Sequence, residues 1–286
     1  MEMAQILPNG DKANLMTQEQ TKSAETQQVS GVDAFLGFAQ GLADISGPLC
    51  RDYFRHPLIV DLKADSSPVT VADRAVESLL RETIQVAYPD HGIFGEEHGT
   101  EDSDSPFTWV LDPIDGTKSF ITGMPTFGTL IALLENGKPI VGIVDIPALG
   151  ERWVGAKKHA TLLDGALCRT RACTRLEQAH LYATSPDIFS PADGAVFERV
   201  SALAAMRRFG GDCYAYGLLA SGHVDVVMET SLEPYDFMAL VPVIEGAGGV
   251  ITDWDGMALT LASDGRVLAA ATADLHRNIL NVMQAD

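Results

Sequence analysis

The chain has 286 residues, and its 39 Asp and Glu against 20 Lys and Arg give a formal net charge of −19. Hydrophobic residues make up 46% and charged residues 21%, a globular composition that excludes a chain disordered throughout. An acidic surface without a Lys/Arg stripe repels the phosphate backbone, so we expect no nucleic-acid partner. A substrate that carries phosphate would need a cation as mediator.

Neither a membrane span nor a secretory signal is expected from the chain. No apolar run approaches the roughly 18 residues that a spanning helix needs. Residues 1–30 are polar and without an apolar period, which predicts a disordered N-terminal extension. The four cysteines form no C-x-x-C pair and are too sparse for a disulfide framework or a structural zinc site. We therefore expect a cytoplasmic protein with no membrane partner.

Two helices are predicted at the start of the folded part. Apolar residues recur every three to four positions from Asp33, which predicts a first helix with Asp33 near its N-cap. Its apolar positions are Phe35, Phe38, Leu42, Ile45 and Leu49. A second helix is predicted over 70–87, where Thr70 and Asp73 form an approximate capping box.

Strands are predicted next. Short β-like segments at 91–95 and 107–111 each end in a carboxylate-rich turn. Segments 127–134 and 140–146 flank Glu135-Asn136-Gly137-Lys138, and Asn-Gly between apolar runs is a strong hairpin signal.

The second half of the chain alternates between strands and helices. Strands are predicted near 180–184 and at 206–209, 224–229, 249–252 and 266–271, and helices at 194–205, 212–222, 235–246 and 273–284. Alternation of this kind indicates helices layered on sheets. We expect one domain over 31–286, with a seam near residues 148–168 that divides it into 31–150 and 151–286.

The most informative stretch is W-V-L-D-P-I-D-G-T at 109–117. An apolar strand leads to Asp112, a proline forces a turn, and Asp115 follows three residues later, so both carboxylates can face one point. Two like charges this close are costly alone, and all-oxygen ligands suit Mg²⁺ or Mn²⁺. Gly116 and Thr117 then offer backbone N–H groups for a phosphate oxygen. Taken by itself, Asp115-Gly116 is far more typical of a surface turn than of a metal site.

Two further carboxylate clusters are ambiguous when each is taken alone. Gly95-Glu96-Glu97 follows a short apolar segment, but adjacent Glu residues usually lie on a solvated face. Asp236 lies in the first turn of the predicted helix 235–246, where a carboxylate can simply interact with the helix dipole.

Together, the order and residue types of these clusters resemble the inositol monophosphatase superfamily of Mg²⁺-dependent, Li⁺-sensitive phosphomonoesterases. The resemblance covers about residues 33–285. The matching segments are Ser67-Pro-Val-Thr70-Val-Ala-Asp73, Gly95-Glu96-Glu97, Asp112-Pro-Ile-Asp115-Gly-Thr117, Tyr235-Asp236 and Glu245-Gly-Ala-Gly-Gly249. The resemblance implies an αβαβα five-layer sandwich, which is an α/β fold of layered type, and a homodimer.

The resemblance also implies a set of metal ligands. One Mg²⁺ would be held by Glu96, Asp112 and the carbonyl of Ile114, and a second by Asp112, Asp115 and Asp236. A third, loosely bound Mg²⁺ is implied near Glu96 and Asp73. Mn²⁺ is an expected substitute.

The chemistry implied for this site is hydrolysis of a phosphate monoester by metal-activated water. Thr117, with Glu96 or Asp73, would help to activate a water that attacks phosphorus in line, and a second metal would neutralise the leaving alkoxide. The amides of Gly116 and Thr117 would bind the phosphate oxygens.

Within the superfamily, the segments 211–217 and 232–249 look like the histidinol-phosphate phosphatase branch, which acts in histidine biosynthesis. Three positions depart from the inositol phosphatase pattern in the same direction. Ser67 stands where Asp is usual, Tyr235 where Trp is usual, and Asp212 where a small residue is usual. The expected substrate is therefore L-histidinol phosphate.

The substrate expectation depends mainly on Asp212 and Glu229. Histidinol carries an ammonium group and an imidazole, with which these carboxylates could pair, whereas inositol offers only hydroxyls. The alternative for Asp212 is that it caps the predicted helix 212–222, since Asp is a preferred N-cap residue.

Other functions stay open at this point. Inositol monophosphatase is one, and adenosine 3',5'-bisphosphate 3'-phosphatase is another, although the latter needs positive charge for a second phosphate and only Arg207 and Arg208 lie near the second-half motifs. A protein of a different class would bind a macromolecular partner and keep a vestigial phosphatase site. The complete set of metal ligands argues against that class.

Overall fold

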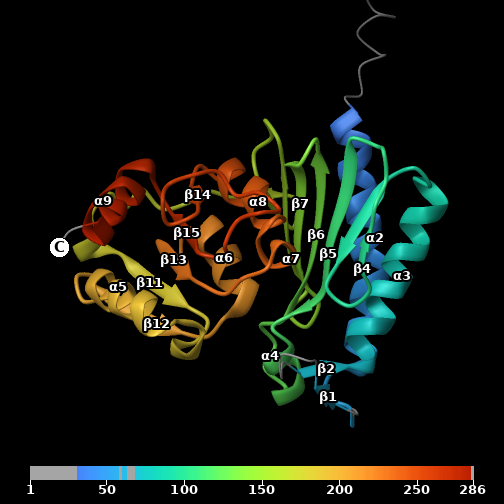
Figure 1. The fold of residues 1–286 in the computed structure, drawn as a ribbon, viewed down its shortest axis with the longest axis horizontal. Coiled ribbons are helices and arrows are strands. Elements are labelled where there is room, and N and C mark those ends of the chain that lie inside the picture. The colour runs from blue at the N-terminus through green and yellow to red at the C-terminus, as the bar shows by residue number, and fades with distance from the viewer. Residues whose placement is uncertain (1–30, 58–59, 63–67, 285–286) are drawn as a thin grey trace, which may run out of the picture.

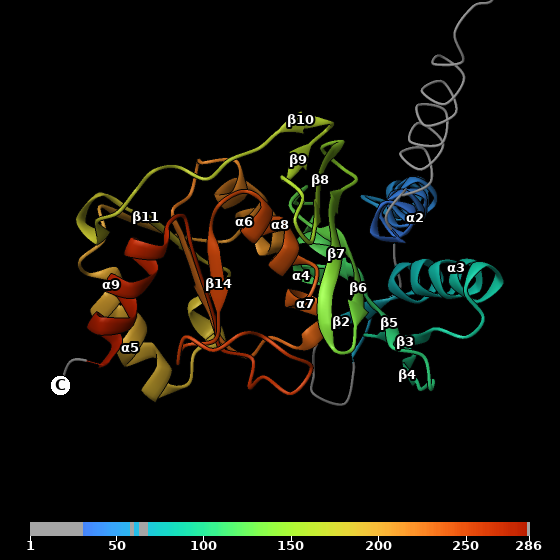
Figure 2. The ribbon, with the colours of Figure 1, turned by 90° about the horizontal axis from the view of Figure 1, so that it is seen from above.

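The computed structural model describes residues 31–57, 60–62 and 68–284. These residues form five layers, helix, sheet, helix, sheet and helix, which Figures 1 and 2 show in two orientations. The predicted αβαβα sandwich is therefore confirmed. The predicted disordered extension at 1–30 lies outside the described residues.

The elements have the following bounds. The helices are α2 (Gly31–Tyr53), α3 (Val71–Ala87), α4 (Thr117–Thr122), α5 (Pro191–Ser201), α6 (Asp212–Ala220), α7 (Pro234–Phe237), α8 (Leu240–Gly246) and α9 (Ala273–Gln284), with 3₁₀ turns at Leu176–Gln178 and Pro186–Ile188. The strands are β1 (Val60–Leu62), β2 (Pro68–Thr70), β3 (Gly92–Gly95), β4 (Gly99–Glu101), β5 (Phe107–Asp115), β6 (Gly128–Glu135), β7 (Lys138–Ile146), β8 (Glu151–Ala156), β9 (Leu162–Leu163), β10 (Ala166–Leu167), β11 (His180–Ala183), β12 (Met206–Phe209), β13 (Val226–Glu229), β14 (Val250–Thr252) and β15 (Val267–Ala270).

The first layer consists of α2 and α3, which pack on one face of an eight-stranded sheet of order β10-β9-β8-β7-β6-β5-β3-β4. The predicted capping box of α3 is confirmed, because Thr70 is the N-cap and Asp73 Oδ2 accepts the Thr70 N–H at 2.8 Å. The prediction that Asp33 lies near the start of the first helix is confirmed, because Asp33 is in the first turn of α2, which is described from Gly31. Ile45 is 38% exposed because the buried face of α2 follows Leu42, Ala43, Ser46 and Cys50 instead.

The predicted hairpin is confirmed as β6 and β7, which pair antiparallel with Glu135 opposite Lys138. Asn136 and Gly137 have φ values of 50° and 74°. These two positive angles are what a type I′ turn requires, and Asn and Gly are the residues that adopt them at least cost.

The segment at the predicted seam forms β8, β9 and β10, which extend the first sheet beyond β7. These strands were not predicted. The division into 31–150 and 151–286 stays a prediction. The strands of residues 151–167 belong to the same sheet as β3 to β7, whereas β1 and β2 form a separate two-stranded sheet.

The second sheet has five strands in the order β12-β11-β13-β15-β14. β11 pairs in parallel with β12 and β13, whereas β15 pairs antiparallel with β13 and β14. The remaining predicted elements of the second half are present, with ends shifted by a few residues. The helices α5 and α9 cover its outer face, and α6, α7 and α8 lie between the two sheets, as the orange ribbons of Figure 2 show.

The single helix predicted at 235–246 is instead two helices, α7 and α8, which are separated at Met238 and Ala239. The break lies four residues before Pro242, which has no N–H to donate to the carbonyl of Met238. A regular helical hydrogen bond is therefore missing at this point, although Met238 and Ala239 keep right-handed helical backbone angles.

Two glycines let α8 approach the first sheet closely. A Cβ on Gly142 of β7 would lie 2.0 Å from the carbonyl oxygen of Ala239, and one on Gly155 of β8 would lie 2.5 Å from that of Pro242. Only glycine fits at these positions, because real Cβ atoms do not approach heavy atoms below about 3 Å. This close packing sets the position of the adjoining helix α7 relative to β5.

All four cysteines are free and buried. Over the described ranges, no helix is both long and apolar enough to cross a membrane.

Candidate active site

A bulge at the end of β5 turns Asp112 and Asp115 to the same side of the sheet. Asp112 lies opposite Leu130 of β6 and Asp115 lies opposite Gly128, so two residues of β5 face the single residue Thr129. In a regular strand, side chains three residues apart point to opposite faces. The extra residue of the bulge reverses this alternation and brings both carboxylates toward α7.

The third carboxylate comes from α7. Asp112, Asp115 and Asp236 each offer one oxygen, and these three atoms lie within 4.8 Å of one another. Each carboxylate also accepts a backbone N–H: Asp112 from Ile114 (3.0 Å), Asp115 from Cys213 (2.6 Å) and Asp236 from Glu233 (2.7 Å). The backbone thus sets the orientation of all three side chains.

The three carboxylates cannot all ionise easily without a cation. Burial raises the pKa of Asp112 well above its usual range, and the charges of Glu96 and Asp115 raise it further. Burial likewise raises the pKa of Asp115, and it raises that of Asp236 to about 7 against the opposing effect of the Glu233 N–H. A set of buried and half-buried carboxylate oxygens with this charge fits a divalent cation such as Mg²⁺.

Glu96 lies in the turn between β3 and β4, which is held by the buried side chain of Glu77. Glu77 accepts the N–H groups of Glu97 (2.7 Å) and His98 (3.2 Å) and the Nε of Arg81 (2.7 Å). A Cβ on Gly95 would lie 2.1 Å from Glu77 Oε1, so glycine is needed here.

Sequence reasoning missed Glu77, although a signal was present. Glu77 lies one helical turn after Asp73 on the buried face of α3, where an amphipathic helix normally has apolar residues. Two fully buried carboxylates on that face indicate that each has a fixed polar partner.

Asp73 and Thr117 contact each other beside the bulge. Asp73 is fully buried, and its Oδ1 accepts the hydroxyl of Thr117 at 3.4 Å. The same hydroxyl lies 3.3 Å from the carbonyl oxygen of Ile114. Asp73, Thr117 and Ile114 thus lie together, although they come from α3, α4 and β5. Ser67, which also belongs to the quoted motifs, lies outside the described residues.

Gly116 forms the N-cap of α4 with a φ of 80°. A Cβ there would lie 2.7 Å from Cγ of Asp212, so glycine allows both the positive φ and the close approach of α6. The prediction that Gly116 and Thr117 bind phosphate is untested. Gly116 is the N-cap and Thr117 the first residue of α4, where backbone N–H groups have no partner within the helix.

A pocket of about 140 Å³ adjoins the carboxylate cluster. It is lined by Asp115, Gly116, Thr184, Ile188, Asp212, Cys213, Tyr216, Glu229, Thr230, Ser231, Leu232 and Asp236. The two predicted substrate-binding residues, Asp212 and Glu229, therefore share one pocket with two predicted metal ligands.

Asp212 does not cap α6, so that alternative was wrong. The N-cap is Gly211, and Asp212 Oδ2 accepts the hydroxyls of Ser119 (2.6 Å) and Thr126 (3.0 Å) instead. The physical reason is tertiary, because the start of α6 lies against α4 and the loop after it. Burial raises the pKa of Asp212, against the two hydroxyls and the charge of Lys118.

Glu229 is held on both carboxylate oxygens. Oε1 accepts the Thr184 N–H at 2.6 Å and Oε2 accepts the hydroxyl of Tyr216 at 2.8 Å. Burial raises the pKa of Glu229, and these two hydrogen bonds oppose the rise. The sequence did not indicate Thr184 as a partner.

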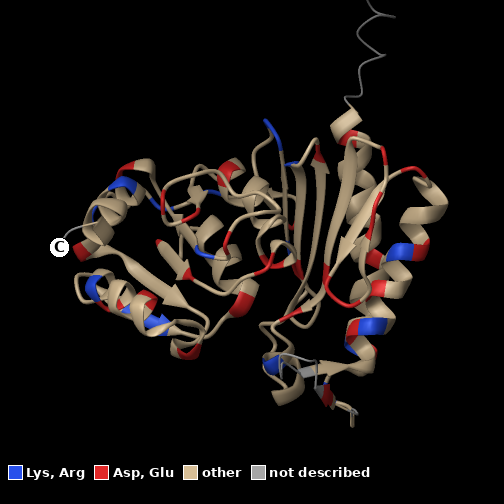
Figure 3. Cartoon of the chain, in the orientation of Figure 1, with Lys and Arg blue, Asp and Glu red and all other residues tan. Residues whose placement is uncertain are grey.

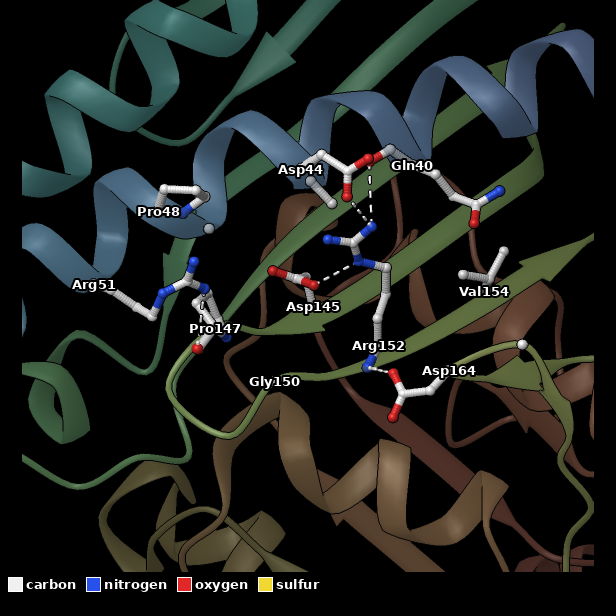
Figure 4. A pocket seen from close by; sticks show the side chains of 13 residues that line it. Gln40, Asp44, Pro48, Arg51, Asp145, Pro147, Gly150, Arg152, Val154 and Asp164 are labelled. Carbon is white, nitrogen blue, oxygen red and sulfur yellow. Dashed lines mark hydrogen bonds and ion pairs between the residues drawn. The ribbon is translucent and has the colours of Figure 1, made fainter.

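A larger pocket of about 350 Å³ lies on the other face of the first sheet, between α2 and strands β7 and β8. Figure 4 shows its charges paired with one another: the guanidinium of Arg152 lies between Asp145 (2.6 Å) and Asp44 (2.7 Å). Arg51 donates to the carbonyl of Pro147. The basic residues of this pocket are thus already engaged by other groups of the chain. In Figure 3, by contrast, the ribbon carries red acidic residues near α7 and the end of β5. The smaller pocket is the candidate active site.

Comparison with known proteins agrees with this geometry. The model of the inositol monophosphatase family matches residues 32–285. The chain is 45% identical to the Bifunctional phosphatase IMPL2, chloroplastic, of Arabidopsis thaliana, over 96% of this chain and 81% of that protein. It is 37% identical to the Histidinol-phosphatase of Mycobacterium tuberculosis, over 87% of this chain and 98% of that one. The structure of an inositol monophosphatase from Zymomonas mobilis matches with a TM-score of 0.82 at 44% identity, over 90% of this chain and all of that chain. This chain therefore belongs to the inositol monophosphatase family and is a phosphatase of that family.

Proposed function

We propose that this phosphatase hydrolyses L-histidinol phosphate to L-histidinol and phosphate, as in histidine biosynthesis, with two or three Mg²⁺ per subunit. The observation that carries the proposal is the placement of Asp212 and Glu229 in the pocket beside Asp115 and Asp236. Carboxylates in the same pocket as the metal ligands suit a cationic leaving group, because they can accept charged hydrogen bonds from an ammonium or imidazolium. The relative named Histidinol-phosphatase supports the same substrate.

Asp112, Asp115 and Asp236 hold the metals, with Glu96 and the carbonyl of Ile114 as further ligands. Bound Mg²⁺ supplies the positive charge that activates water and offsets the charge of the phosphate.

Thr117 orients the attacking water in this proposal. Its hydroxyl hydrogen is donated to Asp73 or to the carbonyl of Ile114, so its oxygen is available to accept a hydrogen bond from the water. The N–H groups of Gly116 and Thr117 bind oxygens of the phosphate and hold it in line for attack.

Inositol monophosphatase is the second candidate, since the Zymomonas mobilis structure at 44% identity carries that name. The adenosine 3',5'-bisphosphate activity has less support, because none of the residues that line the described pocket is Lys or Arg. Arg207 instead pairs with Glu198, and Arg208 lies over the ring of Tyr182. If the protein instead served as a binding protein with a vestigial site, its turnover with Mg²⁺ would not respond to Asp112→Asn, whereas the phosphatase proposal predicts that this variant loses turnover.

The test compares kcat/KM for L-histidinol phosphate, inositol 1-phosphate and p-nitrophenyl phosphate in wild type, Asp212→Ala and Asp212→Asn. We expect histidinol phosphate to be much the best substrate of the wild type. Both variants should lose about ten- to hundredfold on it, the equivalent of about 1.5–3 kcal/mol for a charged hydrogen bond, with little change on p-nitrophenyl phosphate.

The Asn variant is the matched control for structure, because its amide oxygen can still accept from Ser119 and Thr126. Equal or reversed rates on histidinol and inositol phosphates in the wild type would overturn the substrate. Parallel losses on all three substrates would remove Asp212 from substrate recognition.

We also propose that the chain is a cytoplasmic homodimer, as the family resemblance and the sequence suggest. Light scattering on protein eluting from a size-exclusion column measures the oligomeric state, and a monomer at micromolar concentration would contradict the homodimer. Fractionation of cells measures the location.

A further inference from the structure

Thr129 of β6 lies opposite the bulge of β5. We propose that Thr129 is a positioning residue for the metal-binding segment Asp112–Asp115. The inference rests on the metal site proposed above. Thr129 belongs to none of the motifs singled out in the sequence, and its side-chain hydrogen bonds go to Pro113 and Cys50 rather than to Asp112 or Asp115.

The bulge creates a need that Thr129 meets. Two residues of β5, Pro113 and Ile114, lie opposite Thr129 alone, so the regular ladder of backbone hydrogen bonds is interrupted there. Thr129 Oγ1 donates to the carbonyl oxygen of Pro113 at 2.9 Å. Thr129 is fully buried, so bulk water cannot replace this donor.

Thr129 acts from the opposite side of the sheet. Thr129 pairs with Asp145 of the neighbouring strand β7, and its hydroxyl contacts Cys50 of α2. The Thr129 side chain therefore faces the first helical layer. The next residue, Leu130, packs instead in the core between the two sheets, on the side of Asp112. Thr129 therefore acts on the carboxylates only through the backbone of the bulge.

Cys50 orients the hydroxyl of Thr129. Its Sγ lies 3.7 Å from Thr129 Oγ1, and burial raises the pKa of the thiol to about 12, so it keeps its proton. Because the Thr129 hydrogen is donated to Pro113, the thiol is the donor in the Cys50 contact. This chain of contacts links α2 to the carbonyl between the metal ligands Asp112 and Ile114.

Loss of the Thr129 hydroxyl should loosen the bulge while leaving its packing intact. Thr129→Val has nearly the same shape but leaves the Pro113 carbonyl without a donor. Partners that orient metal ligands typically change metal affinity by about 10–100-fold when removed. We expect Thr129→Val to weaken Mn²⁺ binding about tenfold and Thr129→Ser to stay within about twofold of wild type.

The measurement is titration of metal-free protein with Mn²⁺, with free Mn²⁺ followed by electron paramagnetic resonance, and thermal unfolding in parallel. Thr161→Val is the matched control, because Thr161 is also fully buried and donates its hydroxyl to a backbone carbonyl, that of Val243 in α8, at 2.6 Å. This control should lose stability without a change in Mn²⁺ affinity. Thr129→Ala, which also lacks a donor, should weaken binding in the same direction and serves if the Val variant does not fold.

Wild-type affinity in both Thr129→Val and Thr129→Ala would overturn the inference, and so would equal weakening in Thr161→Val. A wild type that binds no Mn²⁺ would instead refute the proposed metal site itself. The two failures are therefore distinguishable.

Discussion

Glu77 offers a direct test of how strongly a buried charge holds the turn that carries Glu96. Its carboxylate is fully buried and accepts three hydrogen bonds, from Arg81 and from the N–H groups of Glu97 and His98. We expect Glu77→Gln to destabilise the chain and to lower phosphatase activity, because the displaced turn carries a predicted metal ligand.

The magnitude follows from the donors around the side chain. Gln keeps one oxygen but places an NH₂ group where the other oxygen stood, so one donor of Arg81 or Glu97 faces another donor. A lost hydrogen bond to a charged group costs about 1.5–3 kcal/mol, and breaking a buried ion pair costs about 3–5 kcal/mol. The Arg81 side chain is only 10% exposed, and its second carboxylate partner, Glu101, is 3.8 Å away and half exposed. We therefore expect about 3 kcal/mol, or a fall in Tm of about 6–12 °C for a chain of this size.

Urea and thermal unfolding of wild type, Glu77→Gln and Glu198→Gln would measure this loss. Glu198 pairs with Arg207 at 2.6 Å, but the two side chains are 61% and 41% exposed, so its loss should cost less than about 1 kcal/mol. If Glu77→Gln cost no more than Glu198→Gln, the argument that burial makes the Glu77 network strong would be refuted.

Two further predictions concern the metal site and pH. Asp115→Asn should abolish turnover and the rise in Tm on adding Mg²⁺, yet leave the metal-free protein as stable as wild type, because burial and neighbouring carboxylates already oppose ionisation of Asp115; a near wild-type rate at moderate Mg²⁺ would contradict the assignment. Burial lowers the pKa of His91 below 6.5, and Trp109 Nε1 donates to its Nδ1 at 3.1 Å, a bond that only the unprotonated nitrogen accepts. The unfolded chain takes up this proton at a higher pH than the folded chain, so the stability from neutral His91 is present above about pH 6.5 and is lost as the pH falls. Urea unfolding at pH 7.5 and 5.5 should therefore show a smaller loss in His91→Asn than in wild type, whereas equal losses would exclude His91 as the titrating group.

The sequence by itself determined the elements whose cause is local. The capping box of Thr70 and Asp73 and the turn at Asn136-Gly137 depend on residues within three positions of one another, and both are present. The order of the carboxylate motifs also sufficed to identify the family. These signals are readable because each one depends on short-range geometry.

Only the tertiary structure decided which side chains meet in the pocket. Ser119 lies 93 positions from Asp212, and their hydrogen bond replaced the helix cap that local propensity favoured. The convergence of Asp236 with the bulge of β5 likewise depends on how closely α8 approaches Gly142.

The roles of Glu77 and Thr129 in supporting the metal site also depend on tertiary structure, because both side chains are buried. A buried polar group must find a partner, and that partner is set by sheet register and helix packing rather than by its neighbours in sequence. No local pattern distinguishes Thr129 from any other threonine of a strand. Its position opposite a two-residue bulge does so, and that position exists only once β5 and β6 have paired.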